Sequence, residues 1–183
     1  NSLSVIYQEN SCCYTVSRAY LPFDLSSLPA GSITAASFSF FTVSDPVLNE
    51  DNLIVTSYTG GETNTFTEAD YMKFGSQAFS SLSFNDITGY QRNYMPLNSN
   101  SFSYIRNASQ YCILVVMTQE DLNAITPEPY SGGSVDFYSS NETNPSFYPI
   151  LEIQISLNSA PNAPSNPSPE VNAVRQENEV TFT

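Results

Sequence analysis

Apolar residues recur at every second position along much of this chain, which is the pattern of half-buried antiparallel strands. In one clear case, Leu21, Phe23 and Leu25 alternate with other residues before a Ser-Ser-Leu-Pro-Ala-Gly turn, and a second alternating stretch follows that turn. Residues 150–157 alternate just as regularly. The pattern predicts strands at residues 3–7, 13–24, 33–43, 53–58, 81–84, 102–105, 111–118, 135–139 and 150–157.

Helical signals are short and few. Turns of helix are predicted at residues 67–73 and 119–124, and Thr118 precedes the second as an N-cap with acidic residues in the first turn. Many short strands with polar turns and little helix predict an all-β fold. We expect an antiparallel two-sheet β-sandwich with a jelly-roll-like arrangement.

The composition changes after Leu157, which divides the chain into three parts. Residues 1–158 form the predicted sandwich domain. Residues 159–169 are rich in Pro, Asn and Ser and predict an extended linker, since such a segment cannot join a sheet ladder. Residues 170–183 predict one further strand, which is either donated to a neighbouring subunit or the start of another module. The apolar residues of this assembly strand are Val171, Val174, Val180 and Phe182.

The charge balance narrows the possible partners. Five Lys and Arg face eighteen Asp and Glu, which gives a net charge of −13. Such a surface repels nucleic-acid backbones and anionic lipids, so neither is expected as a partner. No apolar run is long enough for membrane insertion. Cations, neutral glycans and other copies of the chain remain as partners. Solubility rests on uncharged polar residues, which favours an extracellular or cell-surface location, and the start at Asn-Ser-Leu leads us to expect a processed product or a fragment.

The three cysteines suggest one disulfide bond. Cys12 and Cys13 are adjacent, so in a strand their side chains point to opposite faces. Counting in steps of two from Leu21 places Cys13 on the inward side, which predicts a Cys13–Cys112 bond, with Cys12 free or joined to another molecule. A β-bulge would make Cys12 the partner instead, and three unbonded thiols are the other interpretation. The absence of histidine and of CxxC spacing argues against zinc.

Acidic loop residues form the candidate metal site. Asp45, Glu50 and Asp51 offer hard oxygen ligands of the kind that calcium prefers, although their spacing matches no EF-hand loop. The alternative is a set of solvated loop carboxylates. No other cofactor is expected.

Two sequons and a set of tyrosines complete the candidate sites. Asn107-Ala-Ser109 and Asn141-Glu-Thr143 are predicted glycosylation sites. Tyr90, Tyr94, Tyr104 and Tyr130 could form a sugar-stacking face, whereas the alternative is that they cover half-buried strand surface. Without histidine there is no Ser-His nucleophile, and the chain has no glycine-rich phosphate loop. We therefore expect no enzyme.

One stretch carries a family resemblance: Arg18-x-x-Leu21-x-Phe23-Asp24-Leu25-Ser26, continuing through Leu28-Pro29-x-Gly31-x-Ile33-x-x-Ala36. Further parts are residues 102–105 leading to 111–117, and residues 135–143 followed by 148–153. Together they resemble the DNRLRE-type domain, a secreted β-sandwich related to carbohydrate-binding modules. The chain departs from that family in having no Trp, in placing Pro22 within a strand, and in lacking the strand that usually precedes residues 3–7.

The lacking strand suggests a function. A sandwich short of one strand exposes unpaired backbone groups, and a spare tethered strand could cover them. We therefore expect a non-enzymatic extracellular structural protein, a subunit of a surface filament or sheath that assembles head to tail by strand complementation. The alternative is a carbohydrate-binding or adhesive module of a larger secreted protein.

Overall fold

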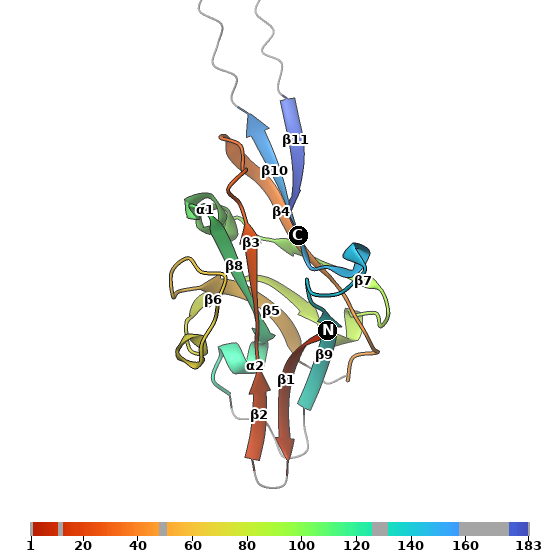
Figure 1. Ribbon diagram of the computed structural model, residues 1–183. Coiled ribbons are helices and arrows are strands. Elements are labelled where there is room, and N and C mark those ends of the chain that lie inside the picture. The colour runs from red at the N-terminus through yellow and green to blue at the C-terminus, as the bar shows by residue number, and fades with distance from the viewer. Residues whose placement is uncertain (1, 11–12, 48–50, 126–131, 158–175, 183) are drawn as a thin grey trace, which may run out of the picture.

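A computed structural model describes residues 2–10, 13–47, 51–125, 132–157 and 176–182 (Figure 1). The strands are β1 (Ser2–Asn10), β2 (Cys13–Ser17), β3 (Ala19–Asp24), β4 (Ser32–Phe41), β5 (Asn52–Tyr58), β6 (Phe74–Ser83), β7 (Arg92–Leu97), β8 (Tyr111–Thr118), β9 (Gly132–Tyr138), β10 (Ile150–Leu157) and β11 (Gln176–Phe182). The helical segments are η1 (Glu68–Asp70), η2 (Phe84–Asp86), α1 (Asn100–Asn107), α2 (Gln119–Leu122) and η3 (Pro145–Phe147). The predicted all-β, sandwich-like fold is confirmed.

Three antiparallel sheets make up this fold, in the orders β3-β8-β5-β6, β11-β10-β4-β7 and β2-β1-β9. The second and third are linked, because single bridges join Thr42 to Phe137 and Val47 to Ser134. The main core includes Phe38, Leu151 and Ile153, which are fully buried. Burial of such side chains is the main favourable contribution to folding.

The central strand β8 is buried on both faces. Residues 112–117 are 0–1% exposed, which explains why they form a continuous apolar run instead of an alternating one. On its outer face, Ile113, Val115 and Met117 belong to a second cluster. The segment 59–73 and α2 cover that cluster, since Phe66 and Leu122 pack on it.

Strand β11 lies along β10 at the border of the β11-β10-β4-β7 sheet (Figure 1). Their antiparallel register runs from Leu151 opposite Phe182 to Leu157 opposite Gln176. The predicted C-terminal strand therefore forms and pairs within the same chain.

Two sequence expectations about strands were wrong. The predicted strand at 102–105 lies in helix α1, where Asn98 Oδ1 accepts a hydrogen bond from Asn100 N (3.0 Å) at the start of the helix. Phe102 and Ile105, spaced three apart, pack on the core. The predicted strand at 13–24 is divided at Arg18 into β2 and β3. Strand β7 and most of β6 were not predicted. The helical turns around residues 67–73 and 119–124 are confirmed as η1 and α2, and Thr118 Oγ1 accepts from Asp121 N at the predicted cap.

Candidate functional site

The first candidate site is the side of β10 on which β11 pairs. Strand β10 pairs with β4 on one side and with β11 on the other. Its residues Leu151, Ile153 and Ile155 are fully buried. Val180 lies opposite Ile153 and Phe182 opposite Leu151, whereas the other two predicted assembly residues lie outside the described residues, as does the predicted linker. The 18 residues between the paired strands far exceed the two to five of ordinary hairpins.

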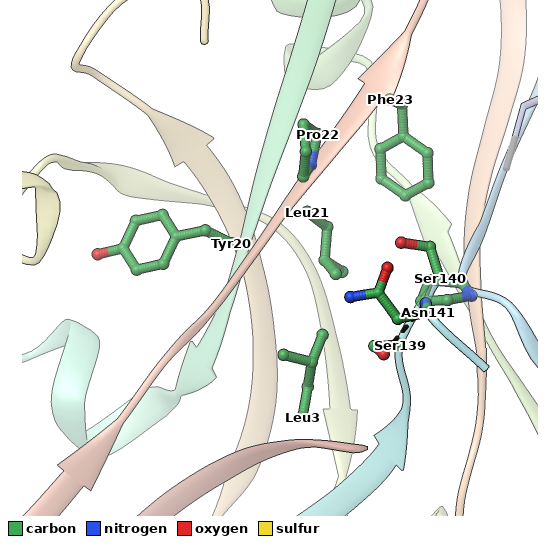
Figure 2. A pocket seen from close by; sticks show the side chains of 9 residues that line it. Leu3, Tyr20, Leu21, Pro22, Phe23, Ser139, Ser140 and Asn141 are labelled. Atoms are coloured by element: carbon green, nitrogen blue, oxygen red, sulfur yellow. Dashed lines mark hydrogen bonds between the residues drawn. The ribbon is translucent and has the colours of Figure 1, made fainter. Parts of the chain in front are cut away.

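Strand β3 forms the border of another sheet. Among the described strands it is hydrogen-bonded only to β8, and it contains Pro22, which lacks an N–H donor. Beside β3 is a hollow of about 170 Å³ (Figure 2). The connection between β9 and β10 supplies its other wall, so segments that are far apart in sequence meet there. Its lining consists of Leu3, Tyr20, Leu21, Pro22, Phe23, Ser139, Ser140, Asn141 and Pro149.

A shallow groove of about 210 Å³ lies on the β4, β7 and β10 strands. Its floor has small side chains from β4, including Ala35 and Ser37, and its walls include Pro96, Glu152 and Gln154. Ser37 Oγ donates to Glu152 Oε2 at 3.0 Å. The groove offers hydroxyl, carboxylate and amide groups together on one sheet face.

The predicted tyrosine face is not assembled as expected. Tyr104 packs against the core from α1, and its hydroxyl donates to the Ile113 carbonyl at 2.7 Å. Tyr90 and Tyr94 are 63% and 56% exposed. Tyr94 stands two residues from Pro96 on β7, hence on the groove side of that strand. Tyr130 lies outside the described residues.

The predicted calcium ligands have separate surroundings. Asp45 is exposed, whereas Asp51 is 5% exposed. The Asp51 carboxylate accepts hydrogen bonds from the backbone N–H of Asn52 (2.7 Å) and from the start of α2. Burial raises the pKa of Asp51. In the part of the chain that the structure describes, no three acidic, histidine or cysteine side chains form a cluster. Glu50 lies outside that part.

The predicted Cys13–Cys112 bond was wrong. Cys112 is a free thiol, fully buried in the core. It pairs with Phe23 on β3, whereas Cys13 pairs with Asn10 at the far end of β2. Because β2 and β3 are extended, the ten residues from Cys13 to Phe23 span roughly 33 Å at about 3.3 Å per residue, far beyond the roughly 7 Å that a disulfide permits between Cα atoms. The alternative partner, Cys12, lies outside the described residues.

A buried ion pair, which the sequence did not predict, holds the segment 59–73 in place. Arg18 forms two 2.6 Å contacts with the Asp121 carboxylate, and the two side chains are only 5% and 7% exposed. The Arg18 guanidinium lies over the rings of both Tyr71 and Phe74, 4.1 and 4.5 Å from their centroids. It also donates to the Tyr71 carbonyl at 2.5 Å. Bidentate and aromatic contacts of this kind fix a guanidinium strongly.

Two further carboxylates anchor the same segment. Asp70 accepts from the Tyr58 hydroxyl at 2.5 Å and from Lys73 Nζ at 2.9 Å. The Tyr58 bond, followed by that of Lys73, lowers the pKa of Asp70, whereas burial and then Asp70 raise the pKa of Tyr58 to about 12. Glu62 accepts hydrogen bonds from the N–H and hydroxyl groups of Ser109 and from Gln110 N at 2.8 Å, and the Ser109 bonds lower its pKa to about 2. The Glu62 contacts join the segment 59–73 to Ser109 and Gln110, which lie just before β8.

Both sequon asparagines are exposed. Asn107 is the last residue of α1, and Asn141 follows β9 in the wall of the hollow beside β3. The Ser109 hydroxyl of the first sequon is bound to Glu62 at 2.7 Å. Thr143 Oγ1 of the second donates to Glu142 Oε1 at 2.9 Å.

The described helices include none that is both long and apolar enough to cross a bilayer. Neither a scan against models of protein families nor a search of curated proteins finds a match for this chain. The resemblance to the DNRLRE-type domain therefore stays a prediction.

Proposed function

We propose that this protein is a non-enzymatic, extracellular structural subunit whose copies assemble by exchanging β11. In the assembled form, β11 of one copy occupies the β10 border of the next. The contact joins different surfaces, so it propagates head to tail into a filament or sheath.

One observation carries the proposal: β11 completes the β10 border through seven residue pairs, while 18 residues separate the two strands. Without β11, the eight-residue strand β10, whose alternate side chains are buried apolar residues, would form an exposed border, which is a template for another chain. The segment 158–175 includes four prolines. At about 3.1 Å per residue in an extended conformation, it would reach roughly 56 Å. The same pairs can then form within one chain or between two.

Disulfide trapping tests the exchange. Gln154 lies opposite Glu179, and directly opposed Cα atoms are about 4.5–5.5 Å apart, within disulfide range. One chain carries Q154C and the other E179C, both without the N-terminal cysteine pair. After the two are unfolded together, refolded and oxidised, we expect mixed disulfide dimers on non-reducing gels. As a matched control, Q154C is paired with Q176C, because Gln176 lies opposite Leu157 instead.

The double variant Q154C/E179C provides the reciprocal experiment. Its disulfide holds β11 within its own chain, so filaments seen by electron microscopy should disappear when it is oxidised and return when it is reduced. Strand exchange would be contradicted if the mixing experiment gave monomers alone, or if the oxidised double variant still formed filaments.

The groove on β4, β7 and β10 favours a second candidate function, the binding of a neutral glycan. Its small floor, its polar walls and the exposed Tyr94 nearby suit a polyhydroxylated ring with an apolar face. Glycan-array binding that is lost in Y94A and Q154A but kept in Y90A would support this function. Tyr90 is equally exposed and does not line the groove, so it is the matched control. Equal loss in all three variants, or no binding by the unaltered chain, argues against it.

A further inference from the structure

The sequon Asn141-Glu-Thr143 opens onto the hollow beside β3. Figure 2 shows the Asn141 amide directed toward Leu21 across that hollow, and not away from it. The Asn141 backbone N–H donates to Ser139 Oγ at 3.3 Å, which helps to fix the start of the sequon. A group attached to Asn141 Nδ2 would therefore begin inside the hollow.

The lining has the chemistry of a seat for one sugar ring. Leu3, Leu21 and Phe23 give an apolar base, while Ser139 and Ser140 place hydroxyl groups on the opposite wall. A pyranose has the same division, with an apolar C–H face and a polar rim. A cavity of about 150 Å³ holds a benzene molecule, so a hollow of about 170 Å³ has room for one six-membered ring.

The hollow also lies beside the border of β3, where a bound group could cover exposed backbone. The β3 border has no second strand among the described residues, and Leu21 and Phe23, which are 6% and 2% exposed, come from it. Exposed strand borders next to apolar residues promote association between chains. A bound ring would shield this border without adding a strand.

We propose that Asn141 carries an N-linked glycan whose first sugar ring lies in this hollow and covers the border of β3. Attachment forms a bond between Asn141 Nδ2 and C1 of the sugar. The C1–oxygen bond to a lipid-linked diphosphate donor breaks, the diphosphate leaves, and the amide loses one proton to a base of the transferring enzyme. The proposal does not depend on strand exchange, so either can fail without the other.

The second sequon provides a matched control. Asn107 lines a different hollow, of about 150 Å³, whose lining includes Tyr58 and Tyr111 and not β3. The variants N141Q and N107Q thus remove one acceptor each and alter the chain by the same chemistry. Only N141Q should affect the β3 border.

The experiment uses the full chain secreted from a eukaryotic host, with its glycans trimmed to the single first sugar. Mass spectrometry should find that sugar on the peptide containing Asn141. NMR should show nuclear Overhauser contacts between its ring protons and the methyl groups of Leu3 and Leu21. Trimmed protein should melt a few degrees above N141Q, and N107Q should keep both the contacts and this difference.

The outcomes separate clearly. An unmodified Asn141, or a sugar without contacts to Leu3 or Leu21, overturns the proposal. As a check on folding, N141Q and the unaltered chain are also made in a host without glycosylation. There they should melt together, and a deficit of N141Q in that host would assign the effect to the asparagine side chain and overturn the stabilising role of the sugar.

Discussion

Replacing Arg18 by Met should destabilise the fold severely. R18M keeps much of the side-chain volume but removes the cation that two 2.6 Å contacts join to Asp121, where both side chains are at least 93% buried. Removing one partner of a buried ion pair leaves an uncompensated charge, which costs about 3–5 kcal/mol. Since domains of this size are stable by about 5–15 kcal/mol, R18M should lose a large part of its free energy of unfolding.

The double variant R18M/D121L distinguishes charge burial from lost packing. It removes both charges and leaves apolar groups of similar volume, so its stability should return to within about 1–2 kcal/mol of the unaltered chain. K73M is the control, because the Lys73–Asp70 pair is 43% exposed at the lysine and should be worth about 1 kcal/mol or less.

The free energies of unfolding are measured by urea titration, monitored by far-UV circular dichroism and by fluorescence. The fluorescence is that of tyrosine, because the chain has no Trp. Limited proteolysis within residues 59–73 should accelerate in R18M, because Arg18 also binds the Tyr71 carbonyl. The reasoning is refuted if R18M costs no more than K73M, or if the double variant is as unstable as R18M.

Two further predictions concern titratable groups. The pKa of Glu62 is about 2 in the folded chain and about 4.5 in an unfolded one, so its carboxylate stabilises the fold above pH 4.5 and this contribution is lost as the pH falls toward 2. The difference in free energy of unfolding between the unaltered chain and E62Q, measured with urea at several pH values, should therefore shrink as the pH falls from 4.5 to 2. A constant difference would contradict the prediction. Burial, and to a smaller extent the charge of Glu62, raises the pKa of the Cys112 thiol to about 12. In a chain without the other two cysteines, this thiol should therefore react with Ellman's reagent at pH 8 only after unfolding. Rapid reaction of the native protein would contradict this prediction, because it would show that the thiol is accessible.

The sequence predicted the strands in which the order of apolar and polar residues reflects which faces of the strand are buried. Residues 111–118 and 150–157 were assigned with the same bounds as β8 and β10, because one is a continuous apolar run and the other alternates. Strand β7 was hidden, since the polar Asn93 takes a buried position and Pro96 interrupts the pattern. The short apolar run at 102–105 fits a helix as well as a strand, and period alone cannot separate them.

The candidate site was less predictable, because its contacts join distant parts of the chain. Arg18 was singled out, and Asp121 was recognised in the first turn of a helix, but 103 residues separate them and no local pattern pairs them. Nothing in the sequence marked Glu62 as a partner of the β8 start. The cysteine argument considered which face each side chain occupies and omitted position along the strand, which decided the outcome.

Pro22 distinguishes the sheet border at β3 from the side of β10 on which β11 pairs. Pro22 has no N–H group with which β3 could bind an approaching strand, whereas β10 pairs with β11 along seven successive residues. Under the proposed strand exchange, a neighbour's strand would therefore add at β10 in preference to β3. A filament assembled as proposed would lengthen at β10 without recruiting neighbouring filaments along β3.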